Sequence, residues 1–350
     1  MKSDEFDVNE VTIRNLMSHT AGTSVHGFPG YKSIDKTPSI VDVLNGEGNT
    51  PPVKMIYPAD STWHYSDGGY EILHLLIEDV SGEGFTSFMQ REVLEPFGMN
   101  SSTYELINTQ DGDTCVKAYD YFGEVYKQGW NQYPESAAAG LWTTAEDLSR
   151  FLIKMYKIYN GVDGIITYDQ VKEMFTPVKN NYGLGFGIED NQNGIFVGHS
   201  GKNFGFTNDM VINLKTGNGA VVMTDSDGAF PLINEVMARC PGNDGWHVRE
   251  QKYFETVSLS AEDYKSCEGK CTLTMRNGKK YKVEVVYKDN ELLFYDKQRG
   301  ITEVLIPVKT LSGLNFVVER DGSEISFGFE SEGSENWTMS WGEETIFIKK

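Results

Sequence analysis

The 350-residue chain is acidic, with 51 Asp and Glu residues against 31 Lys and Arg residues and a formal net charge of −20. Residues 1–250 hold 34 of the acidic and 17 of the basic residues. This charge repels phosphate backbones and anionic lipids, which argues against nucleic acid and membrane surfaces as partners. No apolar run reaches the roughly 18–20 residues of a membrane span, and residues 1–7 lack the features of a secretory signal.

Helical patterns dominate the first half of the chain. Residues 11–19 predict a short helix that ends at the turn Thr20-Ala21-Gly22, and Ser39 is placed to cap a second helix over residues 40–44. Apolar residues at helical spacing predict a longer helix over residues 70–80, and residues 86–94 predict one that ends before Pro96. Residues 143–147 resemble a capping box, with Asp147 in the acid position, that opens a helix over residues 148–159.

The pattern changes to strands after Gly183. Antiparallel strands are predicted over residues 184–188, 195–197, 206–214 and 219–224, followed by a helix over residues 230–240. A Gly-, Asn- and Asp-rich linker is predicted over residues 241–251, and about eight short strands follow it. The sequence therefore predicts an α+β domain over residues 1–245, with a helical block and an antiparallel sheet, followed by a small antiparallel β-barrel over residues 255–350.

The four cysteines indicate mainly structural roles. Cys267 and Cys271 have the spacing of a short-loop disulfide, which needs an oxidising compartment and suitable geometry. No histidine follows this pair, so the second half of a zinc site is missing, and we predict no metal. Cys115 and Cys240 are expected to be buried apolar residues.

Two polar stretches could carry chemistry. In the first, Tyr65-Ser66-Asp67 comes just before the predicted helix of residues 70–80. A phenol titrates near ~10, so Tyr65 can act as a base at neutral pH only if a nearby lysine or histidine stabilises its anion. The alternative is a core or turn aromatic. In the second, His199-Ser200-Gly201-Lys202 places an imidazole, a hydroxyl and backbone N–H groups in succession at the sheet edge, which suits a carboxylate or oxyanion.

Taken together, these stretches resemble motifs of the serine β-lactamase, DD-peptidase and β-lactamase-like esterase superfamily, most closely its class C-type, peptidase S12-like branch. Residues 11–22 resemble its Leu-x-x-His-Thr-x-Gly segment and residues 65–67 its Tyr-x-Asn motif. Residues 139–148 resemble its Gly-Leu-x-Ser-Thr-Ala-x-Asp-Leu segment, and residues 199–201 its Lys/His-Thr/Ser-Gly strand. Residues 255–350 resemble the lipocalin-like barrel that often follows this domain.

The resemblance implies a role for each matching residue. Tyr65 is the expected general base and later acid, and His199 assists it and the substrate carboxylate. Ser200 and Gly201 lie where the family orients substrate, and the Lys202 backbone N–H is half of the oxyanion hole. Asp67 stands where the family has an asparagine that holds substrate and lysine. Since a carboxylate only accepts hydrogen bonds, this replacement favours a protonated lysine.

The family nucleophile is a Ser-x-x-Lys pair at the start of a buried helix, upstream of the segment that residues 11–22 resemble. The chain contains this pattern once, as Ser33-Ile34-Asp35-Lys36, in a predicted loop close to Pro38. Ser33 and Lys36 are therefore a weak nucleophile pair, and we expect the N-terminal part of the domain to be missing. Its absence should expose apolar surface, which a second polypeptide or a homo-oligomer would cover.

The resemblance predicts a serine hydrolase that needs no cofactor and acts on D-amino-acid peptides, β-lactams or small esters in the periplasm or outside the cell. With the nucleophile motif absent, we expect this chain to show little or no acylation. The alternatives are a non-catalytic protein that binds cell-wall-type peptides and a lipocalin-like ligand carrier.

Overall fold

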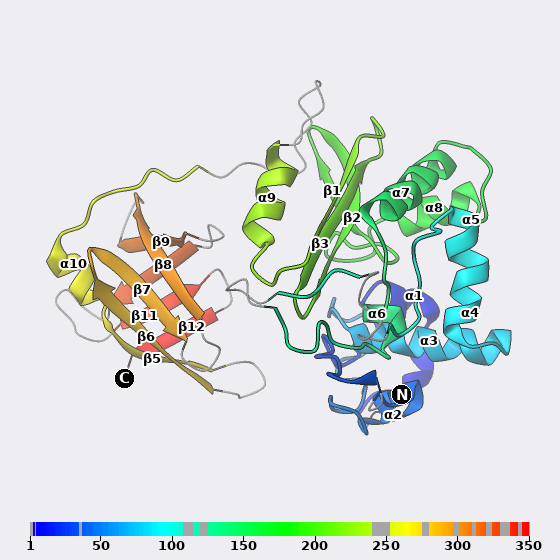
Figure 1. Cartoon of the computed structure of the whole chain (residues 1–350), viewed down its shortest axis with the longest axis horizontal. Coiled ribbons are helices and arrows are strands. Elements are labelled where there is room, and N and C mark those ends of the chain that lie inside the picture. The colour runs from blue at the N-terminus through cyan, green and yellow to red at the C-terminus, as the bar shows by residue number, and fades with distance from the viewer. Residues whose placement is uncertain are drawn as a thin grey trace. The chain divides into compact units, whose positions relative to one another are not determined.

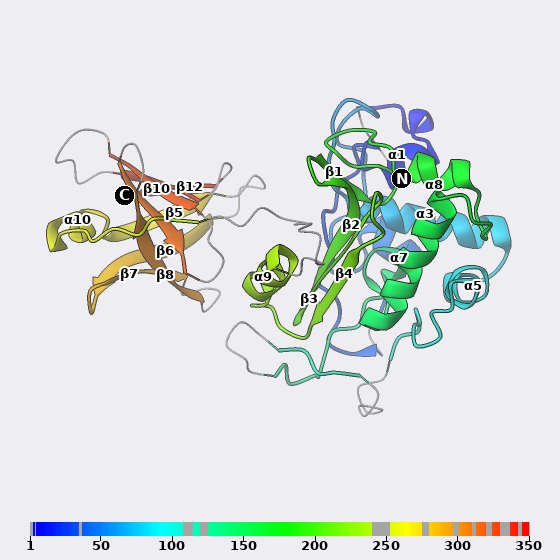
Figure 2. The same ribbon diagram turned by 90° about the horizontal axis from the view of Figure 1, so that it is seen from above.

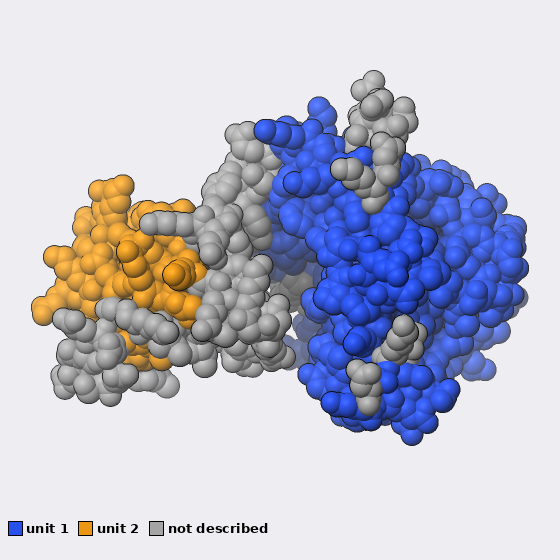
Figure 3. All heavy atoms as spheres, turned by 90° about the horizontal axis from the view of Figure 1, so that it is seen from below, with its two compact units in different colours: residues 1–249 blue, residues 250–350 orange. Residues whose placement is uncertain are grey.

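The computed structural model describes residues 3, 5–34, 37–107, 115–119, 125–239, 253–274, 280–296, 301–309, 313–319, 324–329, 337–341 and 345–349. The chain divides into two compact units, residues 1–249 and residues 250–350 (Figure 3). None of the helices in the described ranges has the length and apolar character needed to cross a membrane. Lys36, Cys240 and the predicted linker of residues 241–251 lie outside these ranges.

Unit 1 opens with short helical elements whose ends follow the capping residues in the sequence. Thr12 caps α1 in a capping box with Asn15, and Ser39 caps α2 in the same way with Asp42. Gly22 has a φ of +67°, and a Cβ there would lie 2.2 Å from the Tyr57 carbonyl oxygen, so the turn after α1 requires glycine. These first elements are η1 (Val8–Glu10), α1 (Ile13–Met17) and α2 (Ile40–Asn45).

The helical layer that follows is built around two 15-residue helices. Ser66 caps α3 and Gly82 ends it in the left-handed region, so the helix begins three residues before the predicted range of residues 70–80. The segment predicted to end before Pro96 instead continues through a π-helical turn, because Pro96 falls in the first turn of α5, where no backbone N–H is needed. The layer contains α3 (Asp67–Ser81), α4 (Phe85–Met89), η3 (Gln90–Leu94), α5 (Glu95–Phe97), α6 (Ser136–Ala139), α7 (Ala145–Tyr159) and α8 (Tyr168–Met174).

The sheet of unit 1 is antiparallel, in the order β1-β2-β3-β4. Helix α7 packs on one face and α9 on the other (Figures 1 and 2). Most of the stretch around His199 is strand rather than a turn, because β2 pairs with β3 without interruption up to Asn203. The sheet and its outer helix are β1 (Gly187–Asn191), β2 (Gly194–Asn203), β3 (Phe206–Asn213), β4 (Gly219–Thr224) and α9 (Phe230–Arg239).

Unit 2 is a closed antiparallel barrel in which β12 returns to pair with β5. Aromatic and aliphatic side chains such as Phe294, Phe316 and Trp337 fill its interior. Cys267 and Cys271 are buried in this core and form no disulfide with each other. The unit contains α10 (Ala261–Ser266), β5 (Gly269–Thr274), β6 (Lys280–Lys288), β7 (Glu291–Asp296), β8 (Ile301–Val308), β9 (Leu314–Val318), β10 (Glu324–Phe329), β11 (Trp337–Trp341) and β12 (Thr345–Lys349).

Candidate functional site

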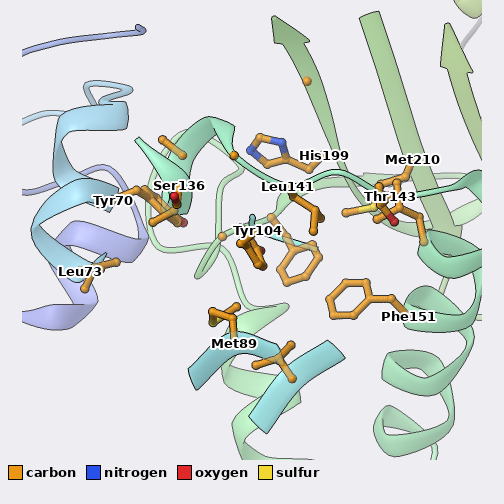
Figure 4. Close-up of a pocket in the computed structure, with 18 of the residues that line it drawn as sticks. Tyr70, Leu73, Met89, Tyr104, Ser136, Leu141, Thr143, Phe151, His199 and Met210 are labelled. Carbon is orange, nitrogen blue, oxygen red and sulfur yellow. The ribbon is translucent and has the colours of Figure 1, made fainter. Parts of the chain in front are cut away.

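A cavity of about 590 Å³ lies in unit 1 between the helical layer and the sheet. Its walls come from α3, α4, η3, α6, α7 and β2–β4, and apolar side chains such as Leu73, Met89 and Phe151 dominate them (Figure 4). Tyr65, Asp67 and His199 are among the residues that line it. Segments about 130 residues apart in the sequence therefore meet at one cavity.

The first turn of α3 positions Tyr65 and Asp67. The Ser66 hydroxyl accepts a hydrogen bond from the Gly69 N–H at 3.1 Å and donates one to the Ser24 carbonyl at 2.6 Å. A Cβ at Gly68 would lie 2.7 Å from that same carbonyl oxygen, so the close approach of the two segments requires glycine there. This packing fixes the backbone on both sides of Ser66, with Asp67 at the helix N-terminus, where a carboxylate is favourable.

The Tyr65 ring lies in a group of aromatic side chains. Its centroid is 4.1 Å from that of His19 and 6.3 Å from that of His199. The Tyr65 hydroxyl hydrogen-bonds to the Asp67 carboxylate. Tyr65 is thus close to both histidines, while its hydroxyl has a carboxylate as partner.

His199 bonds to a different tyrosine. Its Nε2 lies 2.9 Å from the Tyr182 hydroxyl, and its Nδ1 lies 2.6 Å from the Ser200 carbonyl oxygen. Because a carbonyl can only accept, Nδ1 carries the proton and Nε2 accepts from Tyr182. The Tyr70 hydroxyl, which donates to the Met17 carbonyl at 3.0 Å, lies beside the Tyr182 hydroxyl. His199 therefore belongs to a chain of polar groups behind Tyr65.

The electrostatics at Tyr65 differ from the sequence-based expectation. Burial raises the Tyr65 pKa, and the negative charge of Asp67 raises it further. Burial lowers the pKa of His19 to about 3 and also lowers that of His199, so both imidazoles are neutral at pH 7. Among the described residues that line the cavity, none is lysine or arginine. The expectation of a cation that lowers the Tyr65 pKa is therefore wrong for the described part of the chain.

Strand β2 separates the other predicted site residues. Successive side chains of a strand point to opposite faces, so His199 shares the α7 face with Val197, while Ser200 and Lys202 share the α9 face with Phe196. The Lys202 ammonium lies 5.5 Å from the Phe230 ring on α9. The pairing of β1 with β2 ends at Gly198, so no described strand pairs with the β1 side of residues 199–203. Ser200 and Lys202 can thus contribute backbone groups along this edge, while the backbone groups of Gly201 face Asn208 of β3.

The predicted nucleophile pair lies elsewhere. Ser33 is in a non-helical stretch and is not among the residues that line the cavity. Lys36 lies outside the described residues. The cavity-lining serines are Ser136 and Ser200, and the Ser136 hydroxyl donates to the Pro134 carbonyl at 3.3 Å.

Sequence reasoning missed two buried carboxylates beside the cavity. Glu71 lies one helical turn after Asp67, and its oxygens bond to the Ala138 N–H at 2.8 Å and to His74 at 3.0 Å. Glu135, just before α6, is fully buried, and its carboxylate has no hydrogen-bond partner on another residue in the described ranges, only its own backbone N–H. The four-residue spacing from Asp67 was a signal for Glu71. Glu135 had none, because only the fold brings its loop beside α3.

His19 also gains its place only through the fold. Its φ of 57° is unusual for a residue with a side chain, and it turns the ring toward Tyr65. Its Nδ1 accepts from the Ser66 N–H at 3.1 Å, so Nε2 carries the proton. That Nε2 is buried and has no hydrogen-bond partner among the described residues. The family-like segment of residues 11–22 thus supplies an unpaired donor behind Tyr65.

The fold places helices on both faces of an antiparallel sheet, with Tyr65 just before α3 and His199 on β2 at one cavity. The Beta-lactamase family model matches residues 4–235. The chain belongs to the β-lactamase family.

Curated proteins and solved structures are similar to the chain. Penicillin-binding protein 4* of Bacillus subtilis (strain 168) is 26% identical over 231 residues, which are 59% of this chain and 49% of that protein. The octameric penicillin-binding protein homologue from Pyrococcus abyssi superposes with a TM-score of 0.56 at 20% identity, over 97% of this chain and 78% of its own. The D-amino acid amidase from Ochrobactrum anthropi SV3 gives a TM-score of 0.50 at 17% identity, over 62% and 65%. The chain spans about half the length of the curated relatives it matches.

Proposed function

We propose that unit 1 is the acyl-transfer domain of a serine hydrolase that cleaves amide or ester bonds, of the D-amino-acid peptide, β-lactam or small-ester class. The observation that supports this proposal most directly is that Tyr65, Asp67 and His199 line one cavity. The names of the relatives, a penicillin-binding protein and a D-amino acid amidase, support this class of reaction.

In this proposal Tyr65 transfers protons as a neutral phenol. It takes the proton of the attacking hydroxyl as it releases its own proton to the Asp67 carboxylate, to which it is hydrogen-bonded. The Asp67 pKa is raised to about 7, first by burial and then by Glu71, which suits an acceptor at neutral pH. Residues 200–202 along the β2 edge would hold the substrate, with the Lys202 N–H on the oxyanion. His199 would orient the polar chain through Tyr182.

The described residues at the cavity do not include the serine of a Ser-x-x-Lys pair. The single Ser-x-x-Lys pattern starts at Ser33, which does not line the cavity. We therefore expect little or no acylation by these 350 residues alone, and propose that a second polypeptide or another copy of the chain completes the site. One structure with this fold, the penicillin-binding protein homologue from Pyrococcus abyssi, is octameric, which supports assembly of several copies.

Labelling with a fluorescent penicillin and a fluorophosphonate tests the proposal. We expect weak or no labelling of the 350-residue chain and the same result for Ser33→Ala. Any weak labelling should be lost in Tyr65→Phe, which removes the hydroxyl and keeps the ring. Strong labelling that disappears in Ser33→Ala would show that Ser33 is the nucleophile, contrary to our expectation. Labelling that is unchanged in Tyr65→Phe would show that the Tyr65 hydroxyl is not needed for acylation.

A binding protein without turnover is the second candidate. It is favoured by the raised pKa of Tyr65, because burial and the Asp67 carboxylate both oppose the phenolate that a strong base needs. Titration calorimetry with a D-Ala-D-Ala peptide, combined with product analysis, separates the two candidates. Saturable heat with no released D-Ala supports the binding protein. A folded sample that gives no heat counts against it, and released D-Ala supports the hydrolase.

A further inference from the structure

Most of the cavity wall lies beyond the polar groups and is apolar. One side of α3 lines the cavity through residues at helical spacing, which are Asp67, Tyr70, Leu73 and Ile77. Asp67 and Ile77 are ten residues apart in this helix, which corresponds to about 15 Å along its axis. The cavity therefore follows α3 over most of the length of the helix, from a polar end at Asp67 to an aliphatic end at Ile77.

Methionine is the commonest residue type in the cavity wall. Half of the 12 methionines of the chain line it, and they come from α1, α4, the turn after α5, α8, β3 and β4. The methionine side chain is unbranched and has three rotatable bonds, so it adapts to the shape of what lies against it. A wall built this way suits a flexible apolar ligand. The methionines are Met17, Met89, Met99, Met174, Met210 and Met223.

The wall also contains an unusual helical turn. Residues Gln90–Leu94 form the π-helical turn η3 between α4 and α5, and Val93 and Leu94 of this turn line the cavity. Turns of this kind are rare, occur mostly singly and frequently lie at functional sites. This observation is independent of the apolar composition, and it indicates that the wall is shaped for a ligand.

The polar end of the cavity disfavours an anion. Among the described residues that line the cavity, none is lysine or arginine, and burial keeps His199 neutral at pH 7. The carboxyl residues in the wall are Asp67 and Asp209, and the Asp209 side chain lies on the α9 face of the sheet, because Asp209 is directly opposite Ser200. A ligand at this end therefore meets the Asp67 carboxyl group. A neutral carbonyl group fits there, whereas a carboxylate would be repelled.

We propose that the cavity binds an unbranched acyl chain of about ten to twelve carbons, with a neutral ester or amide head beside Tyr65 and Asp67. The length follows from the extent of the α3 wall, since an extended hydrocarbon with bonds of about 1.5 Å advances about 1.3 Å per carbon. The volume of about 590 Å³ lies within the range of small-molecule sites. The inference rests on the proposed function for the position of the head, and it names the substrates as esters or amides of medium-chain fatty acids.

Methyl ketones test the chain without offering a bond to cleave, because the ketone carbonyl takes the place of the ester carbonyl. Displacement of Nile red or ligand-observed NMR measures the affinity of the intact chain for 2-hexanone, 2-octanone and 2-decanone. Each methylene that enters the apolar wall should tighten binding about three- to four-fold, so we expect a gain on the order of a hundred-fold from 2-hexanone to 2-decanone. Affinities that do not rise along the series would overturn the proposal.

Decanoate tests the neutral head, because it keeps the chain length and carries a charge. At pH 7.5 we expect it to bind at least about ten-fold more weakly than 2-decanone. Asp67→Asn removes the charge of the side chain and keeps its size, so it should reduce this difference to within about three-fold. Asp169→Asn, at an exposed acid on α8, is the matched control and should leave the difference unchanged. Decanoate that binds the wild type as tightly as 2-decanone does would overturn the assignment of a neutral head.

Ile77→Trp fills the end of the wall furthest from Asp67 and shortens the space for the chain. We expect it to weaken 2-decanone binding at least about ten-fold and to leave 2-hexanone binding within about two-fold, because the shorter chain does not reach Ile77. Met89→Phe on α4 (Figure 4) is a second filling variant with the same expected pattern. Leu232→Trp, at a position of α9 that is 58% exposed, is the control and should change neither affinity.

If both filling variants bind 2-decanone as the wild type does, the chain does not occupy this wall and the proposal fails. Ketone binding needs no nucleophile. Loss of penicillin or fluorophosphonate labelling in the same samples would therefore bear on the proposed hydrolase and not on this inference.

Discussion

Two regions of unit 1 each bury a carboxyl group completely, but they differ in its partners. Asp147, at the start of α7, accepts hydrogen bonds from the Ser101 N–H and the Ser102 hydroxyl, each at 2.8 Å, and pairs with Arg150. Burial raises its pKa, but these partners outweigh burial and hold it below the usual range. Glu135, before α6, has none of these partners in the described residues, and burial raises its pKa to about 7.

The two carboxyl groups differ in what they contribute to the stability of the fold. A carboxylate with donors on both oxygens ties together the chain segments that supply them, here α7 and the loop that carries Ser101. A carboxylate with no donor from another segment contributes no such link, and its burial disfavours the ionised form. We therefore interpret Asp147 as a group that ties two segments of the scaffold together, and Glu135 as a group that adds no such tie and that burial keeps protonated at low pH.

The largest expected effect comes from removing the partnered carboxylate. Asp147→Ala leaves the Ser101 N–H and the Ser102 hydroxyl unpaired, and should lower the free energy of unfolding of unit 1 by about 2–4 kcal/mol. Urea unfolding measures this change. Glu146→Ala is the control, because Glu146 pairs with the same arginine but is 75% exposed, and it should cost less than about 0.5 kcal/mol. Equal effects of the two variants would contradict the comparison.

The unpartnered carboxyl should show its effect through pH. With a folded pKa near 7 and an unfolded value near ~4.3, Glu135 favours folding at low pH, and this contribution is lost as the pH rises from about 4 to 7. Glu135→Gln removes the titration. Relative to the wild type, the variant should therefore be more stable at pH 8 than at pH 5 by about 2 kcal/mol.

Urea midpoints of the two proteins at pH 5 and pH 8 check this prediction, with Asp169→Asn as an exposed control that should follow the wild type. A Glu135→Gln variant whose stability runs parallel to the wild type across this range would mean that the Glu135 carboxyl finds a partner in solution.

The smallest effect is expected away from both regions. Ser39 caps α2, accepting from the Asp42 N–H at 3.2 Å and donating to the Asp42 carboxylate at 2.7 Å. Ser39→Ala should cost about 1 kcal/mol of stability and leave the binding of a D-Ala-D-Ala peptide unchanged. Ser39→Asn, which keeps a capping acceptor, should recover most of the loss. A change in peptide binding on Ser39→Ala would show that α2 is coupled to the cavity.

Local signals in the sequence were sufficient for most element boundaries. Ser39 and Thr144 mark helix starts, because each side chain caps the helix within three residues of itself, whereas the Ser66 cap was missed and α3 begins before the predicted residue 70. The capping box at Thr144 is only half formed, since the Asp147 carboxylate turns away to Ser101 and Ser102. That distant partner is invisible to a local pattern.

By itself, the sequence determined the order of helices and strands and the two motifs that bring Tyr65 and His199 to one cavity. Both depend on residues close together along the chain. Only the tertiary structure decided the charge states of the groups around that cavity, because Glu71, Glu135 and the neutral His19 come from three separate segments. Burial and distance set the pKa values of these groups, and neither exists until the segments pack together.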